Sequence, residues 1–332
     1  MSALPSATPP TSGAPATAAA VFPGQGSQAP CMGVPWQAHA AWDLVRRAEQ
    51  QLQRDLSTML LDPGHPPQGT VDAHMAVVLC SMMAWSTLGP DFTPIAVAGH
   101  SLGLVSALYA ARVLSAEDTV TVVSTRAEIC ERACQRTPGG MAAVLASAAI
   151  AEAACADTAC WVANDNAPTQ TVISGTVDGL RLAMTQASLL GARDVIRLDI
   201  AGSFHSPLMR EAAEEFAERL KAVRFRRAST TIVHNGTSSP PFDSTPWGDH
   251  VAVDLVTPVR WLDTQLALAE LGANTIVEVG YGRTLTGLAK RSVPGLLLHN
   301  ASSPRSVAKT ARLKSPTPTG QLSRTPNRVG AR

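Results

Sequence analysis

The sequence predicts an α/β protein in which a small ferredoxin-like domain is inserted into a larger α/β domain. Short apolar strands alternate with helical stretches along most of the chain, as is typical of a sheet covered by helices. Residues 139–200 instead follow the order strand, helix, strand, strand, helix, strand of a ferredoxin-like unit. The segments on both sides, 20–138 and 201–301, have the pattern of a single α/β sheet. With 332 residues, 45% of them hydrophobic, the chain can bury a sizeable core.

The chain begins with a segment, 1–19, that we predict to be a disordered leader. It carries no charged side chain, is interrupted by prolines, and lacks the basic region that opens a signal peptide. Structure is expected to begin with a strand at Ala20–Phe22, which ends in the glycine-rich turn Pro23–Gln28. The next elements are expected as helices at 38–53 and 71–88, a strand at 94–98 and a helix at 102–113.

A long helix is predicted from Ser115 to about Gln135. Ser115 and Asp118 have the spacing of a capping box, in which the serine and the third helical residue cap each other's backbone. The prolines and glycines of 137–140 end this helix, and the inserted domain follows. Its elements are expected as strands at 141–146, 160–163, 171–174 and 194–200, and helices at 148–156 and 177–190.

The large domain is predicted to resume with a helix at Pro207–Val223, because Ser206 is a good N-cap and proline suits the first helical position. Strands at Thr230–Val233 and Thr275–Val279 complete its sheet. Residues 302–332 carry seven of the 27 Lys and Arg residues and no acidic residue, which leaves 20 basic against 26 acidic residues elsewhere. We predict that this segment is a solvated, disordered basic tail rather than a nucleic-acid or membrane contact, and that it is dispensable.

Composition excludes several classes of protein. We find no apolar run of 18 to 20 residues, so no membrane span is predicted. The six cysteines form no C-x-x-C pair and have no histidine at metal-ligand spacing, so they are interpreted as reduced thiols without a metal site. In the absence of a secretion signal, a cytoplasmic location is expected.

The clearest chemical signal is the pentapeptide Gly99-His100-Ser101-Leu102-Gly103. It lies between a predicted strand and a predicted helix, which is the context that a G-x-S-x-G nucleophile elbow requires. In such an elbow a sharp turn exposes the serine hydroxyl, and the amides that open the helix favour negative charge nearby. The pattern therefore predicts Ser101 as a nucleophile, with a plain glycine turn as the alternative.

A serine nucleophile needs a base, and His205 is the best candidate. It lies between the end of a strand and the start of a helix, whereas His39, His65, His74 and His250 are interpreted as lying in polar or loop segments. A structural role for His205 remains open on this evidence alone.

Arg126 is predicted to face the interior of its helix. Its neighbours one turn away are apolar, whereas Arg132 has polar neighbours and is expected to be solvated. A buried guanidinium needs a partner. That partner is either a carboxylate of the protein or an anionic ligand that the planar fork would bind.

Four segments, Val21–Gln28, Gly99–Gly103, Ser203–Met209 and Val277–Gly280, resemble the successive motifs of malonyl-CoA:acyl-carrier-protein transacylases and of the acyltransferase domains of polyketide synthases. They stand in the family's order over about 280 residues. The resemblance implies an α/β-hydrolase-like large domain with an inserted ferredoxin-like small domain, which agrees with the pattern described above.

The resemblance also implies roles for individual residues. Ser101 would be the acyl-accepting nucleophile and His205 the general base, while the backbone amides of Gln25 and Leu102 would form the oxyanion hole. Arg126 would hold the free carboxylate of the malonyl group. A backbone carbonyl near Asp254 would orient the imidazole, and the acidic side chain there is a further candidate to assist it.

The implied reaction is ping-pong transfer of a malonyl or related carboxyacyl group from coenzyme A to the phosphopantetheine thiol of an acyl carrier protein, with no bound cofactor. We expect a monomer that contacts neither nucleic acid nor membrane. Carrier proteins are usually acidic, so Lys290 and Arg291 are candidates for docking, with a simply solvated surface as the alternative.

Some residues depart from the family's pattern. Leu104 stands where glutamate is usual, Tyr281 where proline is usual, and Cys130 where a larger residue is common, whereas Phe204 resembles malonyl-selective members. These departures leave the exact acyl group open and favour a discrete enzyme of a specialised polyketide pathway over one of fatty-acid synthesis.

Three rival functions were considered. An α/β-type serine hydrolase would use a later histidine, namely His234, His250 or His299. A carrier-protein editing hydrolase on the same fold is opposed by Arg126, which indicates a carboxylated substrate. A non-catalytic docking module is opposed by the intact set of Ser101, His205 and Arg126.

Overall fold

The computed structural model describes residues 16–312. A six-stranded sheet forms the centre of the large domain, in the order β11-β10-β1-β2-β7-β8. Neighbouring strands are parallel except for the last pair, β7 and β8, which is antiparallel. The strands are β1 (Ala18–Phe22), β2 (Ala96–Gly99), β7 (Thr231–His234), β8 (Thr237–Ser239), β10 (Thr275–Val279) and β11 (Leu297–Ala301).

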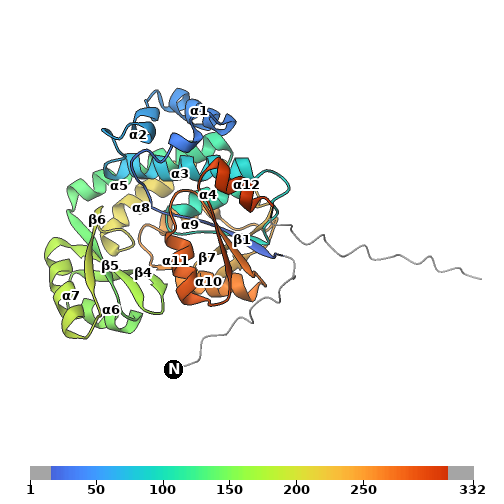
Figure 1. Cartoon of the computed structure of the whole chain (residues 1–332). Coiled ribbons are helices and arrows are strands. Elements are labelled where there is room, and N and C mark those ends of the chain that lie inside the picture. Colours follow the sequence, from blue (N-terminus) through green and yellow to red (C-terminus); the bar gives the residue numbers. More distant parts are fainter. Residues whose placement is uncertain (1–15, 313–332) are drawn as a thin grey trace, which may run out of the picture.

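Helices cover both faces of this sheet (Figure 1). Because side chains alternate along a strand, Ala18, Ala20 and Phe22 of β1 join one core, while Ala19 and Val21 join the other. The first core also receives α3, α4, α5 and α8, and the second receives α10 and α11. The helices of this domain are α1 (Asp43–Leu52), α2 (Ser57–Leu61), α3 (Gly69–Leu88), α4 (Gly103–Ala110), α5 (Ala116–Arg136), α8 (Arg210–Leu220), α9 (Trp247–Val253), α10 (Trp261–Glu270), α11 (Thr284–Ser292) and α12 (Pro304–Thr310).

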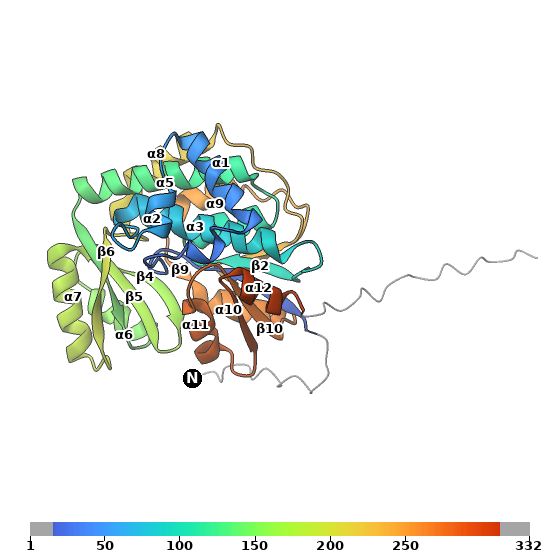
Figure 2. The same ribbon diagram turned by 45° about the horizontal axis from the view of Figure 1, so that its top comes forward.

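The inserted domain contains a second sheet, in the order β6-β3-β5-β4-β9. Its first four strands are antiparallel neighbours, with the strand order of a ferredoxin-like fold, and α6 and α7 pack on one face (Figure 2). The elements are β3 (Gly139–Val144), α6 (Ala148–Cys155), β4 (Cys160–Ala167), β5 (Gln170–Thr176), α7 (Val177–Leu189) and β6 (Val195–Ala201). The predicted α/β fold with an inserted ferredoxin-like domain is confirmed.

The fifth strand of the small sheet, β9, comes from the large domain. It consists only of Val259–Arg260 and runs parallel to β4, with Asn164 opposite Val259 and Asp165 opposite Arg260. The two domains are therefore joined by this strand pairing as well as by the chain crossings at the ends of the insertion.

The long helix α5 begins as its sequence predicts. The hydroxyl of Ser115 accepts the backbone N–H of Asp118, and the Asp118 carboxylate accepts the backbone N–H of Ser115. By contrast, α11 has no local cap. The carboxylate of Glu278 on β10 instead accepts the backbone N–H groups of Leu285 and Thr286. Helix α11 was not predicted, because its capping residue lies on the preceding strand and not at the N-cap position where a local pattern would show it.

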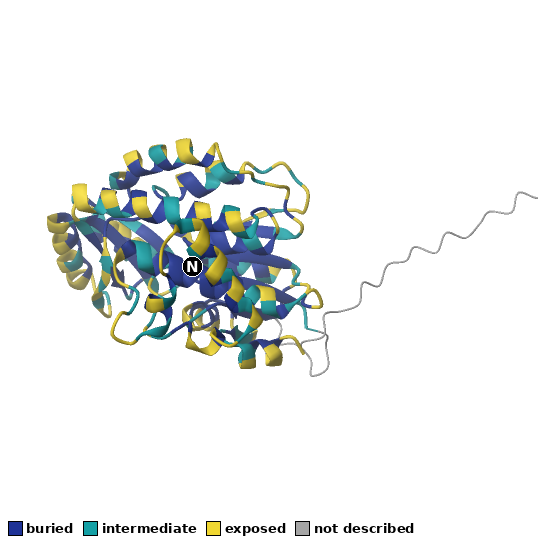
Figure 3. Ribbon diagram, turned by 90° about the horizontal axis from the view of Figure 1, so that it is seen from above, coloured by how far each residue is buried: buried dark blue, intermediate teal, exposed yellow. Residues whose placement is uncertain are grey.

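Helix α3 is the one described helix that is long and apolar enough to cross a membrane by those two measures alone. Its most apolar 18-residue window has a mean hydropathy of 1.3, and 72% of that window is buried within the protein. It packs in the larger core, in the buried interior visible in Figure 3. Its apolar character is therefore that of a core helix.

The predicted boundaries of the folded part of the chain are wrong at both ends. Strand β1 begins at Ala18, inside the predicted leader 1–19. The predicted tail 302–332 begins with α12, where Ser303 and Ser306 form a capping box and Val307 packs in the core. Residues 1–15 and 313–332 of the two predicted segments lie outside the described residues.

A chain that ends at Ser302 is expected to unfold at a lower temperature than one that ends at Arg312. Val307 is 1% exposed, and burying one valine side chain contributes about 1.5 kcal/mol or more. For a protein of this size that corresponds to a Tm lower by about 2–4 °C. Thermal melts of the two truncated chains, followed by circular dichroism, measure the difference. Equal melting temperatures would show that α12 adds nothing to the stability of the core.

Candidate active site

The turn that holds Ser101 is built by two glycines. A Cβ atom on Gly99 would lie 2.1 Å from the backbone nitrogen of Leu104, and one on Gly103 would lie 2.1 Å from the carbonyl oxygen of Phe22. Only glycine lets β1, β2 and α4 approach this closely. Ser101, at the apex, has a φ of 51°, in the left-handed region that functional turns often use. The turn holds its side chain at the carboxyl end of β2.

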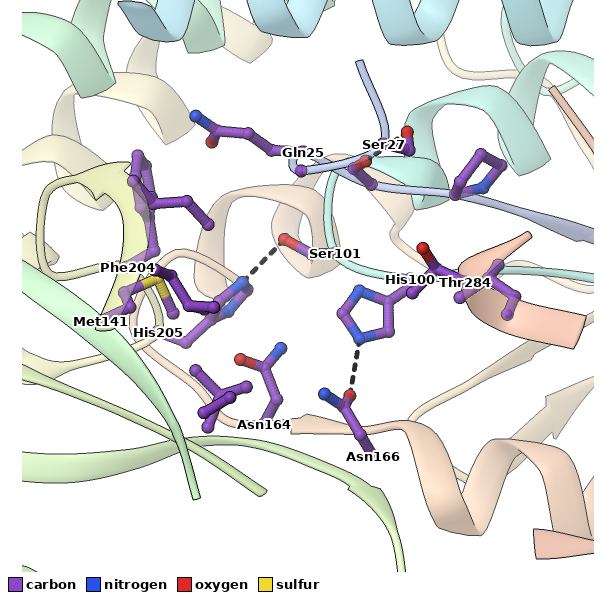
Figure 4. Close-up of a pocket in the computed structure, with 18 of the residues that line it drawn as sticks. Gln25, Ser27, His100, Ser101, Met141, Asn164, Asn166, Phe204, His205 and Thr284 are labelled. Atoms are coloured by element: carbon purple, nitrogen blue, oxygen red, sulfur yellow. Dashed lines mark hydrogen bonds between the residues drawn. The ribbon is translucent and has the colours of Figure 1, made fainter. Parts of the chain in front are cut away.

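His205 lies against Ser101, although the two are 104 residues apart. Its Nε2 is 2.7 Å from the Ser101 Oγ (Figure 4). Its Nδ1 donates to the backbone carbonyls of Asp254, at 2.6 Å, and Thr257, at 3.0 Å. Because Nδ1 carries the proton, Nε2 presents its lone pair to the serine hydroxyl. This is the tautomer that a general base requires.

His205 is only 3% exposed, and this burial sets its charge. Burial lowers the pKa of His205 from an ordinary 6.5 to about 4, although the nearby Asp254 carboxylate acts in the opposite direction. The imidazole is therefore neutral at pH 7 and free to accept a proton.

The Asp254 side chain does not contact His205. Its two carboxylate oxygens lie 2.9 and 3.0 Å from the Nε2 of His234, while its backbone carbonyl points to His205. The orienting group is thus the backbone carbonyl of Asp254, as the resemblance implied, whereas the acidic side chain contacts His234 and not His205. Asp254 follows the last residue of α9, so its carbonyl belongs to the negative end of a helix.

Two backbone N–H groups remain free beside Ser101. Within residues 16–312, the N–H groups of Gln25 and Leu102 donate to no other group of the protein. Gln25 lies in the turn after β1, and Leu102 directly follows the serine. Both positions are those expected for an oxyanion hole.

Arg126 on α5 is 4% exposed and lines the same cavity as Ser101. Its Nη1 lies 3.2 and 3.4 Å from the two ring nitrogens of His74, and in the described part of the chain it forms no ion pair with an acidic side chain. Arg132, predicted to be solvated, is half-exposed and pairs with Glu215. Arg126 therefore holds a buried positive charge that no carboxylate of the described residues neutralises.

These groups surround a cavity of about 450 Å³ between the two domains. The large domain contributes Ser101, His205 and Arg126. The face of the small sheet opposite α6 and α7 supplies the other wall. Residues of that wall are Met141, Ala143, Asn164, Asn166, Val172, Leu198 and Ile200.

The remaining residues singled out by sequence lie around this centre. Leu104 is 2% exposed in the core, and Cys130 is fully buried, which raises the pKa of its thiol to about 11. Tyr281 packs against the core. Lys290 and Arg291 are exposed in the last turn of α11, and Arg291 donates to the cavity-lining Gln170.

Three polar residues of the site, namely His100, Asn166 and His74, were not predicted to take part in it. His100 lies 2.8 Å from the Asn166 Oδ1 through its Nε2 (Figure 4), and His74 lies behind Arg126. The position of His100 within the elbow was a usable signal. The placement of His74 in a polar or loop segment is wrong, because it lies buried in α3. That helix is buried on nearly all sides, so its sequence pattern gives the side chain no direction.

A serine on an elbow, hydrogen-bonded to an imidazole beside a cavity, is the arrangement of serine-dependent acyl-transfer enzymes. The chain belongs to the acyl transferase domain family, whose model matches residues 20–311. The family resemblance inferred from the four motifs is thus confirmed.

Named relatives cover more than four-fifths of the chain. It is 35% identical to the malonyl CoA-acyl carrier protein transacylase of Synechocystis sp., over 84% of this chain and 95% of that protein. It is also 35% identical to the enzyme of the same name from Bacillus subtilis, over 82% and 89% respectively.

Solved structures of malonyl transacylases are also similar to this chain. The Synechocystis sp. malonyl-CoA:ACP transacylase superposes with a TM-score of 0.81 at 33% identity, covering 88% of this chain and 99% of that one. A malonyl-transacylase in complex with a type II PKS acyl-carrier protein superposes with a TM-score of 0.84 at 26% identity, covering 89% and 99%.

Proposed function

We propose that this protein transfers a malonyl group from coenzyme A to the phosphopantetheine thiol of an acyl carrier protein through an acyl-serine intermediate. One observation carries the proposal: the Ser101–His205 pair, 2.7 Å apart, shares a cavity with the buried and unneutralised Arg126. The names of the relatives support the same substrate and acceptor.

The first half-reaction acylates the enzyme. His205 Nε2 takes the proton of Ser101 as Oγ attacks the thioester carbonyl, and the carbonyl oxygen becomes negatively charged. The N–H groups of Gln25 and Leu102 donate to that oxygen. When the C–S bond breaks, the coenzyme A sulfur leaves with the proton held by His205, and malonyl-Ser101 remains.

The second half-reaction reverses these roles. The carrier's phosphopantetheine thiol gives its proton to His205 and attacks the ester carbonyl, and Ser101 regains a proton as its C–O bond breaks. Main-chain and side-chain groups perform every step, so we propose that no cofactor takes part. All of these groups belong to one chain, which supports a monomer as the active unit.

In this proposal, Arg126 determines which acyl group the enzyme accepts. A guanidinium binds a carboxylate through two parallel hydrogen bonds, and a cation buried without a partner is costly, so an acyl group with a distal carboxylate is favoured. An editing hydrolase or a transferase of uncharged acyl groups has no use for this charge. Those alternatives are therefore not favoured.

We further propose that Lys290 and Arg291 contribute to docking of the carrier. Both are exposed, and Arg291 contacts Gln170 at the cavity. Acidic carrier surfaces would be attracted to this end of α11.

Incubation with malonyl-CoA labelled in the malonyl group tests the function. We expect label on the protein within one turnover, and its transfer to a phosphopantetheinylated carrier when that is added. Label that appears instead as free malonate, with or without a carrier, would identify a hydrolase and overturn the proposal.

The acylation rate is expected to stay level from pH 7 down to about pH 5 and to fall with a midpoint near pH 4. Only neutral His205 can take the serine proton, and its pKa lies at about 4. Asp254→Asn keeps the orienting carbonyl but removes the charge that raises this pKa, so its midpoint is expected at lower pH. Single-turnover labelling with acetyl-CoA, which lacks a second carboxylate, gives both profiles, and circular dichroism at each pH verifies folding. A midpoint near 6.5 would contradict the assignment of His205.

A further inference from the structure

His74 is a buried histidine with no part in the mechanism above, yet it contacts two of its groups. It lies on α3, is 0% exposed, and is not among the residues that line the cavity. Its Nε2 is 3.1 Å from the side-chain Oε1 of Gln25, and the Nη1 of Arg126 lies 3.2 and 3.4 Å from its ring nitrogens. His74 thus contacts both Gln25, whose backbone amide is assigned to the oxyanion hole, and Arg126, which is assigned to bind the distal carboxylate.

The protonation state of His74 follows from its surroundings. Burial, and then the charge of Arg126, hold its pKa well below the usual range, so the ring is neutral at pH 7. A neutral imidazole has one donor and one acceptor nitrogen. The Gln25 oxygen can only accept, so Nε2 donates to it, and Nδ1 is the ring nitrogen left with a lone pair. The Arg126 Nη1 lies 3.2 Å from Nε2 and 3.4 Å from Nδ1, so the acceptor that the ring offers to the guanidinium is Nδ1. One tautomer therefore satisfies both neighbours.

These contacts tie two parts of the site to helix α3. Gln25 stands in a glycine-rich turn, where Gly26 has a φ of 98°, and its bond to His74 ties that turn to α3. The Arg126 side chain is long, and its bond to His74 removes part of its rotational freedom. A leucine would fill the same space without the cost of burying a polar ring, but it would make neither bond.

We propose that His74 is a positioning residue for acyl transfer. Through Gln25 it holds the turn that carries one oxyanion-hole amide, and through Arg126 it aims the guanidinium at the distal carboxylate. The inference rests on the proposed function and deepens it, because it couples recognition of the carboxylate to stabilisation of the oxyanion.

Two substitutions of His74 test this role. His74→Leu fills the space without hydrogen bonds, and His74→Gln keeps a donor and an acceptor. For His74→Leu we expect kcat/KM to fall about tenfold with acetyl-CoA, through Gln25 alone, and about a hundredfold with malonyl-CoA, through both contacts. His74→Gln is expected to recover most of both rates. The ratio of malonyl to acetyl activity is the readout that a purely structural histidine would not change.

A matched control separates these effects from stability. Met83 is also buried in α3 and does not line the cavity, so Met83→Ala is expected to lower Tm and to leave the malonyl-to-acetyl ratio unchanged. If His74→Leu does not fold, Gln25→Ala serves instead, because it removes the acceptor of the His74 bond and keeps the backbone amide. That variant is expected to lose about tenfold with either substrate.

The outcomes are distinct. Rates of His74→Leu within twofold of wild type, or an equal loss on both substrates that His74→Gln does not recover, would overturn the inference. An equal loss of kcat/KM on both substrates that His74→Gln does recover would also overturn the inference. His74 would then act through Gln25 alone and not through Arg126. With Gln25→Ala as the substitute, rates within twofold of wild type would overturn it. Failure of the proposed function is seen separately, as absence of malonyl transfer by the wild-type protein.

Discussion

Replacement of Ser101 by alanine is expected to abolish covalent labelling by malonyl-CoA. The hydroxyl is the atom that accepts the acyl group, and no other side chain can supply it at that position. Replacement of His205 by alanine is expected to slow labelling by about 10²–10⁴-fold, the usual contribution of a positioned general base. Mass spectrometry of the labelled protein locates the acyl group, and rapid-quench measurements give the rate.

Ser106 provides a matched control for this experiment. It lies in α4, five residues beyond Ser101, is 1% exposed, and its hydroxyl has no hydrogen-bond partner within the described chain. Ser106→Ala is therefore expected to label as fast as the wild type. Stable acylation of any residue other than Ser101 would refute the nucleophile assignment.

Arg126→Ala is expected to lower kcat/KM for malonyl-CoA by roughly thirty-fold to a few thousand-fold. Loss of one partner of a buried charge pair costs about 2–5 kcal/mol, and about 1.4 kcal/mol corresponds to a factor of ten. Acetyl-CoA has no distal carboxylate, so its transfer should be spared or improved. The measurement is the mutant-to-wild-type ratio of kcat/KM for each substrate.

Arg132→Ala is the natural control, because Arg132 lies on the same helix but is half-exposed and paired with Glu215. Exposed ion pairs contribute little, so both substrates should react normally. Equal losses of Arg126→Ala on malonyl- and acetyl-CoA would mean that Arg126 only maintains the fold. The malonyl assignment would then lose its physical basis.

The parts of the site that could be predicted from sequence have local causes. The elbow was visible because Gly99 and Gly103 are required by close backbone contacts at fixed spacing. Arg126 was recognisable because its helical neighbours are apolar on one side only, which gives its side chain a direction. The capping box of Ser115 is likewise contained in four residues.

The parts that were missed depend on contacts that lie outside the local sequence pattern. The N-terminus of α11 is capped by Glu278 from a strand, and the carboxylate of Asp254 is bound by His234, twenty residues earlier. His74 lies in a helix that is apolar all round, so no periodicity marks the side that faces Arg126. The short helix α12 has a visible start at Ser303 but only one buried apolar residue in its middle, Val307, and so no apolar pattern.

The pairing of β9 with β4 bears on how such enzymes can be recombined. The inserted domain looks like an exchangeable module, bounded by the two chain crossings near residues 139 and 201. Yet its outer strand β4 pairs with Val259–Arg260 of the host, just beyond the Asp254 and Thr257 carbonyls that hold His205. A chimera that exchanges only 139–201 would join unrelated edges next to the general base. Residues 254–260 should therefore be taken from the same parent as the inserted domain.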